Sequence, residues 1–411
     1  MTFEHKLLIQ RYYFFKFESI DATEHQTTHH IQNLCYGQLS IINFMIFRLI
    51  CILHFFLTFS DVFAQQSKLD SLLTKLNSQE RFDGVVLVSK GQKVLFHEAF
   101  GLANRELNAK NTRKTKIATY SVSKTFTAVK VLQLVEKGKL RLDQKIADFF
   151  PKYKDKKGRE VTIQQLLTHT SGFEDFVNYR TVTAYKDFYI NDFEKLLYNS
   201  SPKFTPGKKF SYSSTAYTIL SFIIEKVEGV TFDIAMNSMF KKAGMMNTGV
   251  EGCGEVIQNK SSEYFINPDK DNLIENLTNM FSISSTKGAG AVYSTAEDIY
   301  KFDQALFKGD LINKDLLKMM LNGTKQQLNY GYGIVNFNLE NIGKVYGHQG
   351  GFLWYDIRSI YYHLEKEDLC IVILTNTGMS ESIWNEIVNA SYKFAINSQK
   401  DINLSEKLVL E

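Results

Sequence analysis

The chain has 411 residues, of which 44% are hydrophobic and 22% charged, with 4 prolines and 24 glycines. This composition excludes a disordered, collagen-like or low-complexity protein. The formal net charge of +4 comes from 48 Lys and Arg against 44 Asp and Glu, a balance that argues against a dedicated nucleic-acid binder.

The segment 45–64 (MIFRLICILHFFLTFSDVFA) has the features of a secretory signal peptide. A single Arg48 precedes a short apolar run, and the small residues Val62 and Ala64 follow it, as expected before a cleavage site. The run is shorter than the roughly 20 apolar residues that a membrane-spanning helix needs. We therefore expect an exported protein, periplasmic or secreted; the alternative is that this segment stays uncleaved as a membrane anchor.

This interpretation fixes the expected domain boundaries. We expect residues 1–44 to be an upstream over-prediction of the reading frame, since Met45 is a plausible start. One domain is expected over 65–400, followed by a C-terminal tail at 401–411. No feature indicates the oligomeric state.

Strand-like patterns lie at both ends of this domain. A short helix is predicted at 67–77, followed by a β-hairpin with strands 84–90 and 93–101. A long helix-rich section comes next, and an amphipathic helix is predicted at about 381–397. The predicted C-terminal strands are 330–337, 344–348, 355–364 and 368–376. The pattern indicates an α+β fold in which both chain ends form one antiparallel sheet, flanked by helices, with an inserted helical subdomain.

The main candidate for chemistry is Ser121-Val122-Ser123-Lys124, which opens an apolar run with helical period. Helical spacing places Ser121 and Lys124 one turn apart on the same side. A serine hydroxyl is a weak nucleophile until a neighbouring group accepts its proton, and a lysine can do so when burial lowers its pKa. A second copy of the motif, 284–287, opens no amphipathic helix, so the motif alone is weak evidence.

Further motifs follow in a fixed order: LLTHTSG (166–172), FTPGKKFSYSSTAY (204–217), AGAVYSTAEDIYKF (289–302) and YGHQGG (346–351). Over about 75–400 the chain resembles the serine β-lactamase and penicillin-binding protein superfamily. Within it, the chain resembles the class C-like branch of D-aminopeptidases, alkaline D-peptidases and family VIII carboxylesterases. The resemblance implies a β-lactamase/transpeptidase-like fold and a serine hydrolase that works through an acyl-enzyme.

The resemblance also implies roles for individual residues. Ser121 is the expected acylated nucleophile, Lys124 its partner, and Tyr212 the group that relays a proton to the leaving group. The backbone N–H groups of Ser121 and Gly351 are the expected oxyanion hole, and Gly350 lets the backbone approach the substrate closely. An ordinary half-buried tyrosine is the alternative for Tyr212.

Two positions depart from the family pattern. Ser214 stands where the family usually has Asn, which puts recognition of a substrate amide in doubt, although its hydroxyl could still donate to Lys124 or Ser121. His348 stands where β-lactamases usually have the lysine of Lys-Thr-Gly, and a histidine is mostly neutral at pH 7. His348 thus predicts weak recognition of anionic β-lactams; a histidine that caps a loop at a strand end is the alternative. His169 is expected to be structural.

The expected function is an exported serine hydrolase that acts on esters, amides or D-residue peptides. The alternatives are a non-catalytic penicillin-binding or sensor protein of the same fold and a genuine β-lactamase. The sequence contains no HExxH, CxxC, Walker A or GxGxxG pattern, so we expect no metal and no organic cofactor. The expected partner is a small-molecule or peptide substrate, with no nucleic acid, and with a membrane only through an uncleaved signal segment.

Overall fold

The computed structural model describes residues 68–175, 190–267, 273–278, 283–323, 328–339, 342–352 and 356–396. All of them belong to the second of the two units into which the chain divides, 65–411. The predictions for the leader and for the C-terminal tail lie outside the described residues. Within the described ranges, no helix has both the length and the apolar character that crossing a membrane requires.

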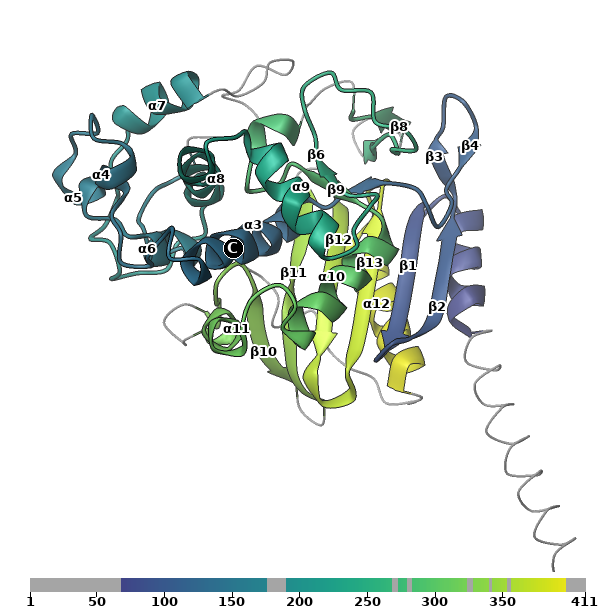
Figure 1. Ribbon diagram of the computed structural model, residues 1–411. Helices are drawn as coiled ribbons and strands as arrows, with labels where there is room; N and C mark the ends of the chain where they lie inside the picture. The colour runs from purple at the N-terminus through teal and green to yellow at the C-terminus, as the bar shows by residue number, and fades with distance from the viewer. Residues whose placement is uncertain are drawn as a thin grey trace, which may run out of the picture. The chain divides into compact units, whose positions relative to one another are not determined.

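The predicted antiparallel sheet from both chain ends is confirmed (Figure 1). Its six strands run in the order β10-β11-β12-β13-β1-β2, and each neighbouring pair is antiparallel. The strands are β1 (Gly84–Lys90), β2 (Lys93–Phe100), β10 (Val335–Leu339), β11 (Gly343–Phe352), β12 (Ile357–Leu364) and β13 (Leu369–Thr375). The N-terminal and C-terminal parts of the chain meet where β1 pairs with β13, from Gly84 opposite Thr375 to Lys90 opposite Leu369.

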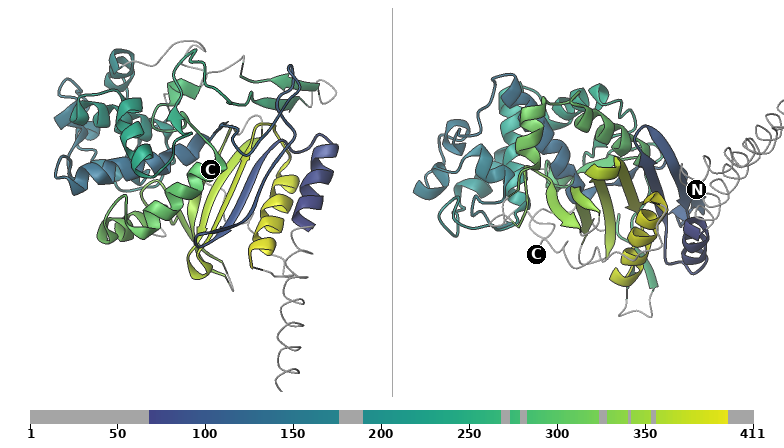
Figure 2. Two further views of the ribbon diagram at one scale, coloured as in Figure 1. Left: turned by 45° about the vertical axis from the view of Figure 1, so that its right-hand side comes forward. Right: turned by 90° about the horizontal axis from the view of Figure 1, so that it is seen from below.

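The sheet separates two hydrophobic cores, because successive side chains of a strand point to opposite faces. Val86 and Val88 of β1 pack with the helix at 68–78 and with α12 (Glu381–Ile396). Val85 and Leu87 join the larger core on the other face, which the inserted helices fill. Figure 2 shows α12 and the N-terminal helix on one face of the sheet and the inserted helices on the other.

The inserted helical subdomain is also confirmed. Its helices are α3 (Ser123–Glu136), α4 (Ile146–Phe149), α5 (Lys156–Arg159), α6 (Ile163–Leu167), α7 (Ile190–Tyr198), α8 (Ser214–Glu228), α9 (Phe232–Lys242), α10 (Ala296–Lys308) and α11 (Lys314–Leu321). Short sheets accompany them: β3 (Leu102–Asn104) with β4 (Ala109–Lys110), β5 (Ile117–Ala118) with β9 (Val292–Ser294) and β6 (Gly249–Val250), and β7 (Tyr264–Asn267) with β8 (Leu273–Asn276).

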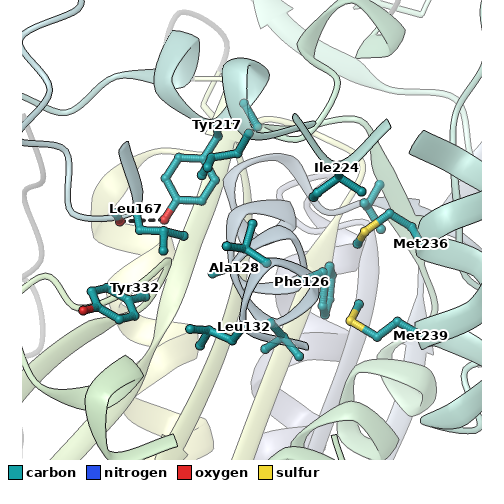
Figure 3. Packing of buried hydrophobic residues seen from close by; sticks show 14 of the residues in the cluster. Phe126, Ala128, Leu132, Leu167, Tyr217, Ile224, Met236, Met239 and Tyr332 are labelled. Atoms are coloured by element: carbon teal, nitrogen blue, oxygen red, sulfur yellow. Dashed lines mark hydrogen bonds between the residues drawn. The ribbon is translucent and has the colours of Figure 1, made fainter. Parts of the chain in front are cut away.

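Helix α3 is buried along almost its whole length, as its apolar sequence predicts. Phe126 packs edge-on against Phe240 of α9 and Phe302 of α10, with ring centroids 5.8 and 4.7 Å apart. α3 shares this core with α6 and α8, which are joined where the Tyr217 hydroxyl donates to the Leu167 carbonyl at the end of α6 (Figure 3). These contacts fix α3 between the sheet and the other helices, so its N-terminus has a defined position.

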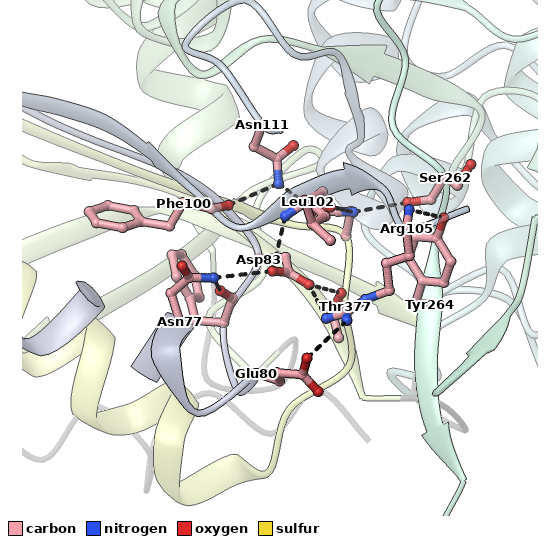
Figure 4. Close-up of polar contacts among 12 residues, drawn as sticks. Asn77, Glu80, Asp83, Phe100, Leu102, Arg105, Asn111, Ser262, Tyr264 and Thr377 are labelled. Atoms are coloured by element: carbon pink, nitrogen blue, oxygen red, sulfur yellow. Dashed lines mark hydrogen bonds and ion pairs between the residues drawn. The ribbon is translucent and has the colours of Figure 1, made fainter. Parts of the chain in front are cut away.

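A buried carboxylate, Asp83, connects the two chain ends beside β1 (Figure 4). It accepts hydrogen bonds from the Leu102 N–H and the Thr377 hydroxyl, at 3.2 and 2.7 Å, and forms an ion pair with Arg105. A buried charge is tolerated only where such partners satisfy it. The network therefore holds the start of β1 against the segment that follows β13.

The predicted strand at 330–337 is wrong in its first half, because β10 begins only at Val335. Residues 331–334 form a turn in which Gly333 has φ +66°, a conformation that favours glycine. A Cβ at Gly333 would lie 2.6 Å from the Lys124 carbonyl oxygen, so this turn packs directly on α3. The turn places Tyr330 in the interior instead of on a strand.

Candidate active site

Ser121 lies in a short 3-10 turn, η1 (Tyr120–Val122), immediately before α3, and not in a regular helix as its spacing suggested. Tyr120 has φ +47°, which is rare for a residue other than glycine. The turn lies against β11: a Cβ at Gly350 would be 2.8 Å from the Ser121 nitrogen and 2.3 Å from the Thr119 oxygen. Gly350 is thus required for the close approach of β11 to this turn; its predicted role in the approach to substrate stays a prediction.

The predicted contact between Ser121 and Lys124 is present, although Ser121 lies in a 3-10 turn and not in an α-helix. Lys124 is 1% exposed, and its Nζ lies 2.9 Å from Ser121 Oγ and donates to the Ala289 carbonyl at 2.9 Å. Burial lowers the pKa of Lys124 to about 7, against a smaller opposing effect of the Asp175 carboxylate. A substantial fraction of Lys124 is therefore a neutral amine near pH 7, able to accept the Ser121 proton.

Tyr212 lies beside the same lysine. The Lys124 Nζ is 4.9 Å from the centroid of the Tyr212 ring, and 5.9 Å from that of Tyr217. Tyr212 directly precedes Ser213, whose hydroxyl caps α8 by accepting from the Ala216 N–H. The cap fixes the backbone at the start of α8, and with it the position of Tyr212 across from Ser121 and Lys124.

Asp175 joins this region from the loop after α6. Its Oδ1 accepts from the Ser213 hydroxyl at 3.2 Å and from the Thr215 N–H at 2.9 Å, so it caps a first-turn N–H of α8. The sequence alone gives no sign of Asp175. No motif marks it, because its role depends on two segments about forty residues apart in sequence.

His348 is buried, at 1% exposure, within β11 and not at its end, so a strand-end cap is not what the structure shows. The Gln349 carbonyl accepts from Nδ1, which leaves Nε2 to accept from the Tyr330 hydroxyl at 2.9 Å. Burial and the nearby Lys124 lower the pKa of His348 to about 3. The ring is thus neutral, and its Nε2 is hydrogen-bonded to the Tyr330 hydroxyl. No sequence motif pointed to Tyr330.

Ser214 and Gly351 have fewer described contacts with the site residues than Tyr212 and His348 have. Ser214 is the first residue of α8 and is half-buried, and the hydrogen bonds described for Lys124 and Ser121 include none to its hydroxyl. The bond that the sequence suggested for Ser214 is therefore not formed here. Gly351 follows Gly350 on β11 and pairs with Arg358 of β12; its part in an oxyanion hole stays a prediction.

The other serines near these motifs have structural contacts. Ser123 Oγ lies 3.1 Å from Thr119 Oγ1 and accepts from the Val292 N–H at 3.1 Å, which ties α3 to β9. In the second motif copy, Lys287 pairs with Glu225 at 3.2 Å. Within the described part of the chain, no group of three or more His, Cys, Asp or Glu side chains is arranged to hold a metal ion.

The chain matches a known family over most of its length. A family model described as Beta-lactamase matches residues 69–384. Penicillin-binding protein 4* of Bacillus subtilis (strain 168) is 30% identical over 360 residues, covering 82% of this chain and 78% of that protein.

Solved structures show the same fold. The penicillin binding protein from Bacillus halodurans is 25% identical with a TM-score of 0.67, covering 78% of this chain and 98% of that one. A D-amino acid amidase from Ochrobactrum anthropi SV3, complexed with L-phenylalanine amide, has a TM-score of 0.70 at 22% identity. That match covers 82% of this chain and all of the amidase chain, and it shows likeness of fold.

Proposed function

The chain belongs to the β-lactamase family, and on that premise we propose that it is a serine hydrolase that forms an acyl-enzyme at Ser121. The observation that carries the proposal is the 2.9 Å contact between Ser121 Oγ and the buried Nζ of Lys124. A nucleophile within hydrogen-bond reach of a base whose pKa is near the working pH is the arrangement that this chemistry needs.

In the proposed reaction Ser121 Oγ attacks the substrate carbonyl carbon and its proton passes to Lys124 Nζ. The negative charge that develops on the carbonyl oxygen is stabilised by the N–H groups of Ser121 and Gly351. The bond to the leaving group then breaks as the Tyr212 hydroxyl delivers a proton to that group, and Lys124 Nζ passes the proton it took from Ser121 back to Tyr212. Water attacks the acyl-enzyme in the second half, which releases the acid and restores the Ser121 hydroxyl.

We propose neutral esters, amides and D-residue peptides as substrates. The support is the neutral, buried His348 at the position where a lysine would bind a carboxylate. The shared fold of the D-amino acid amidase is compatible with amide substrates. A panel of short-chain p-nitrophenyl esters, D-Ala p-nitroanilide and nitrocefin should be turned over in that order of preference. Nitrocefin as the best substrate would refute this reasoning and favour a genuine β-lactamase.

Covalent labelling tests the nucleophile directly. A fluorophosphonate or fluorescent penicillin probe should label the wild-type protein and should not label Ser121→Ala. The matched control is Ser284→Ala in the second motif copy, which should label as the wild type does, since Lys287 is paired with Glu225. Labelling that persists in Ser121→Ala would refute the assignment of Ser121 as the nucleophile.

One alternative has its own observation. Ser214, in place of the usual Asn, forms no bond to Lys124 or Ser121, and this favours a penicillin-binding or sensor protein that acylates without turnover. The two proposals differ in deacylation of the fluorescent penicillin adduct: a hydrolase loses this acyl label over minutes, and a sensor keeps it.

We also propose export, on the basis of the signal-like segment 45–64. N-terminal sequencing of the protein recovered outside the cytoplasm should give Gln65 as the first residue. An intact segment 45–64 in the recovered protein would favour the membrane anchor.

A further inference from the structure

We propose that His169 is a positioning residue for Tyr212, which it holds through the backbone on both sides of that tyrosine. This inference rests on the proposed function, because it gives Tyr212 the proton-transfer role described there. His169 itself forms no described bond to Ser121 or Lys124, so it acts through Tyr212 and not on the substrate.

The first observation is a pair of hydrogen bonds that bracket Tyr212. The Ser211 N–H donates to the His169 carbonyl at 2.9 Å, and the Ser213 N–H donates to His169 Nδ1 at 3.1 Å. Tyr212 is the residue between these two donors. One bond uses the backbone of His169 and the other its side chain, so a single residue fixes both peptide units that flank Tyr212.

The second observation is direct contact between the rings. The centroids of His169 and Tyr212 are 4.3 Å apart, and the His169 ring also packs against Tyr330 at 4.6 Å and Tyr217 at 5.1 Å. Lys124 Nζ lies 4.9 Å from the Tyr212 centroid. His169 therefore supports the tyrosine ring that lies next to the proposed base.

The third observation is the protonation state that these contacts impose. Because Nδ1 accepts from Ser213, the proton of the neutral ring is on Nε2. Burial, together with Lys124 and His348, holds the pKa of His169 well below its ordinary range, so the ring is neutral. Nε2 is buried and has no hydrogen-bond partner among the described residues, which is a cost that a purely apolar side chain would avoid.

The backbone conformation of His169 is also energetically unfavourable. Its φ is +56°, a left-handed conformation that is unfavourable for residues other than glycine and least so for Asn, Asp and His. The neighbouring loop is fixed by bonds from Thr170 N–H to the Gln165 carbonyl and from Gly207 N–H to the Thr170 carbonyl. His169 thus carries both an unpartnered buried nitrogen and an unfavourable backbone conformation. Its bonds to the 211–213 segment offset these two costs.

The experiment compares His169→Asn with His169→Ala. Asparagine tolerates the left-handed conformation, and its side-chain oxygen can replace Nδ1 as the acceptor for Ser213; alanine supplies no acceptor. Site-resolved hydrogen exchange should show that the Ser213 amide loses protection in the alanine variant and keeps it in the asparagine variant. The Ser211 amide, whose acceptor is the backbone carbonyl, should stay protected in both.

The kinetic readout uses leaving groups that need different amounts of protonation. The p-nitroanilide nitrogen must receive a proton to leave, whereas p-nitrophenolate leaves as a stable anion. In His169→Ala we expect kcat for D-Ala p-nitroanilide to fall about 10²-fold, the effect of a misplacement of roughly 1 Å, with KM little changed. The acylation burst with a p-nitrophenyl ester should fall by less than about tenfold, and His169→Asn should restore most of the anilide rate.

A double variant separates positioning from general destabilisation. In the Tyr212→Phe background, His169→Ala should cause almost no further loss, because residues that act as a unit are not additive. Equal losses on both substrates, or losses that add to those of Tyr212→Phe, would overturn the proposal. Failure of the proposed function has a different signature, namely turnover or labelling that survives Ser121→Ala. In that event, the exchange of the Ser213 amide still decides whether His169 holds this segment.

Discussion

Replacing Lys124 by methionine should stabilise the protein while abolishing acylation. The side chain is 1% exposed, and burial lowers its pKa from an ordinary 10.5 to about 7. At 1.36 kcal/mol per pH unit, this corresponds to a cost of about 5 kcal/mol for keeping the charged lysine buried below pH 7. Methionine has a similar length and carries no charge, so it removes that cost.

The variant also loses hydrogen bonds. The Ala289 carbonyl, which now accepts from Lys124, would be left without that donor, at about 1–3 kcal/mol. The net expectation is a gain of about 2–4 kcal/mol in the free energy of unfolding below pH 7. A site that is destabilised in order to hold a base is a common trade between stability and activity.

The sign of the pH dependence follows from proton linkage. Between the folded pKa of about 7 and the unfolded value near 10.5, the unfolded wild-type chain binds one proton more at Lys124 than the folded chain does. Wild-type stability therefore rises by about 1.4 kcal/mol per pH unit relative to the methionine variant, and the advantage of the variant disappears between about pH 8.5 and 10.

Urea unfolding followed by circular dichroism, from pH 6 to pH 10, measures this difference. Lys130→Met is the matched control on the same helix: Lys130 is equally buried but pairs with the partly exposed Glu228 at 2.6 Å, so its replacement removes that ion pair and destabilises. A Lys124→Met variant that is less stable than the wild type at pH 7, or a difference that does not change with pH, would refute the reasoning.

Four further expectations follow. Acylation should accelerate as pH rises through about 7, because Lys124 must be neutral to accept a proton, and kcat/KM for an ester between pH 5 and 9 reports this; a flat profile would contradict it. Gly350→Ala should cut acylation about 10²–10³-fold with unchanged circular dichroism, because the new Cβ would lie 2.3 Å from the Thr119 oxygen and displace the oxyanion donors. Ser214→Asn should raise the rate of labelling by fluorescent penicillin about three- to tenfold, the worth of one hydrogen bond; no change would show that this position does not limit recognition. Asp303→Ala should destabilise by about 3–5 kcal/mol in urea, since this buried carboxylate accepts from the Tyr361 hydroxyl and pairs with His363, and a loss within error would rule out that role.

The parts of the fold that could be predicted are those encoded by local pattern. Strand β13 carries an uninterrupted apolar run and is buried at every residue, and the hairpin of β1 and β2 begins and ends within one residue of its predicted bounds. Strand β10 was placed too early because the alternation in 330–337 looks the same in a strand and in a glycine-rich turn. Only the packing of Gly333 on α3 distinguishes the two.

The pairing of Ser121 with Lys124 could be predicted because three-residue spacing brings side chains together in a 3-10 turn as well as in an α-helix. The supporting residues could not, because each acts across a long sequence separation. Tyr330 is 18 residues from His348, Asp175 is 38 from Ser213, and Ala289 is 165 from Lys124. The Ala289 contact is also made by a backbone carbonyl, which leaves no mark in the sequence.

The neutral state of His348 follows from its neighbours more than from the identity of the residue. A histidine in water is only mostly neutral at pH 7, whereas here burial and the proximity of Lys124 lower its pKa to about 3. The Tyr330 hydroxyl lies 2.9 Å from His348 Nε2, where a neutral ring nitrogen can accept its proton and a lysine ammonium could only donate to its oxygen. A lysine at 348 would also add a second buried cation beside Lys124, and a like charge lowers the affinity of each for its proton. The proposed preference for neutral substrates therefore depends on the neutral His348 ring that contacts Tyr330, and a lysine at 348 would put a cation in its place.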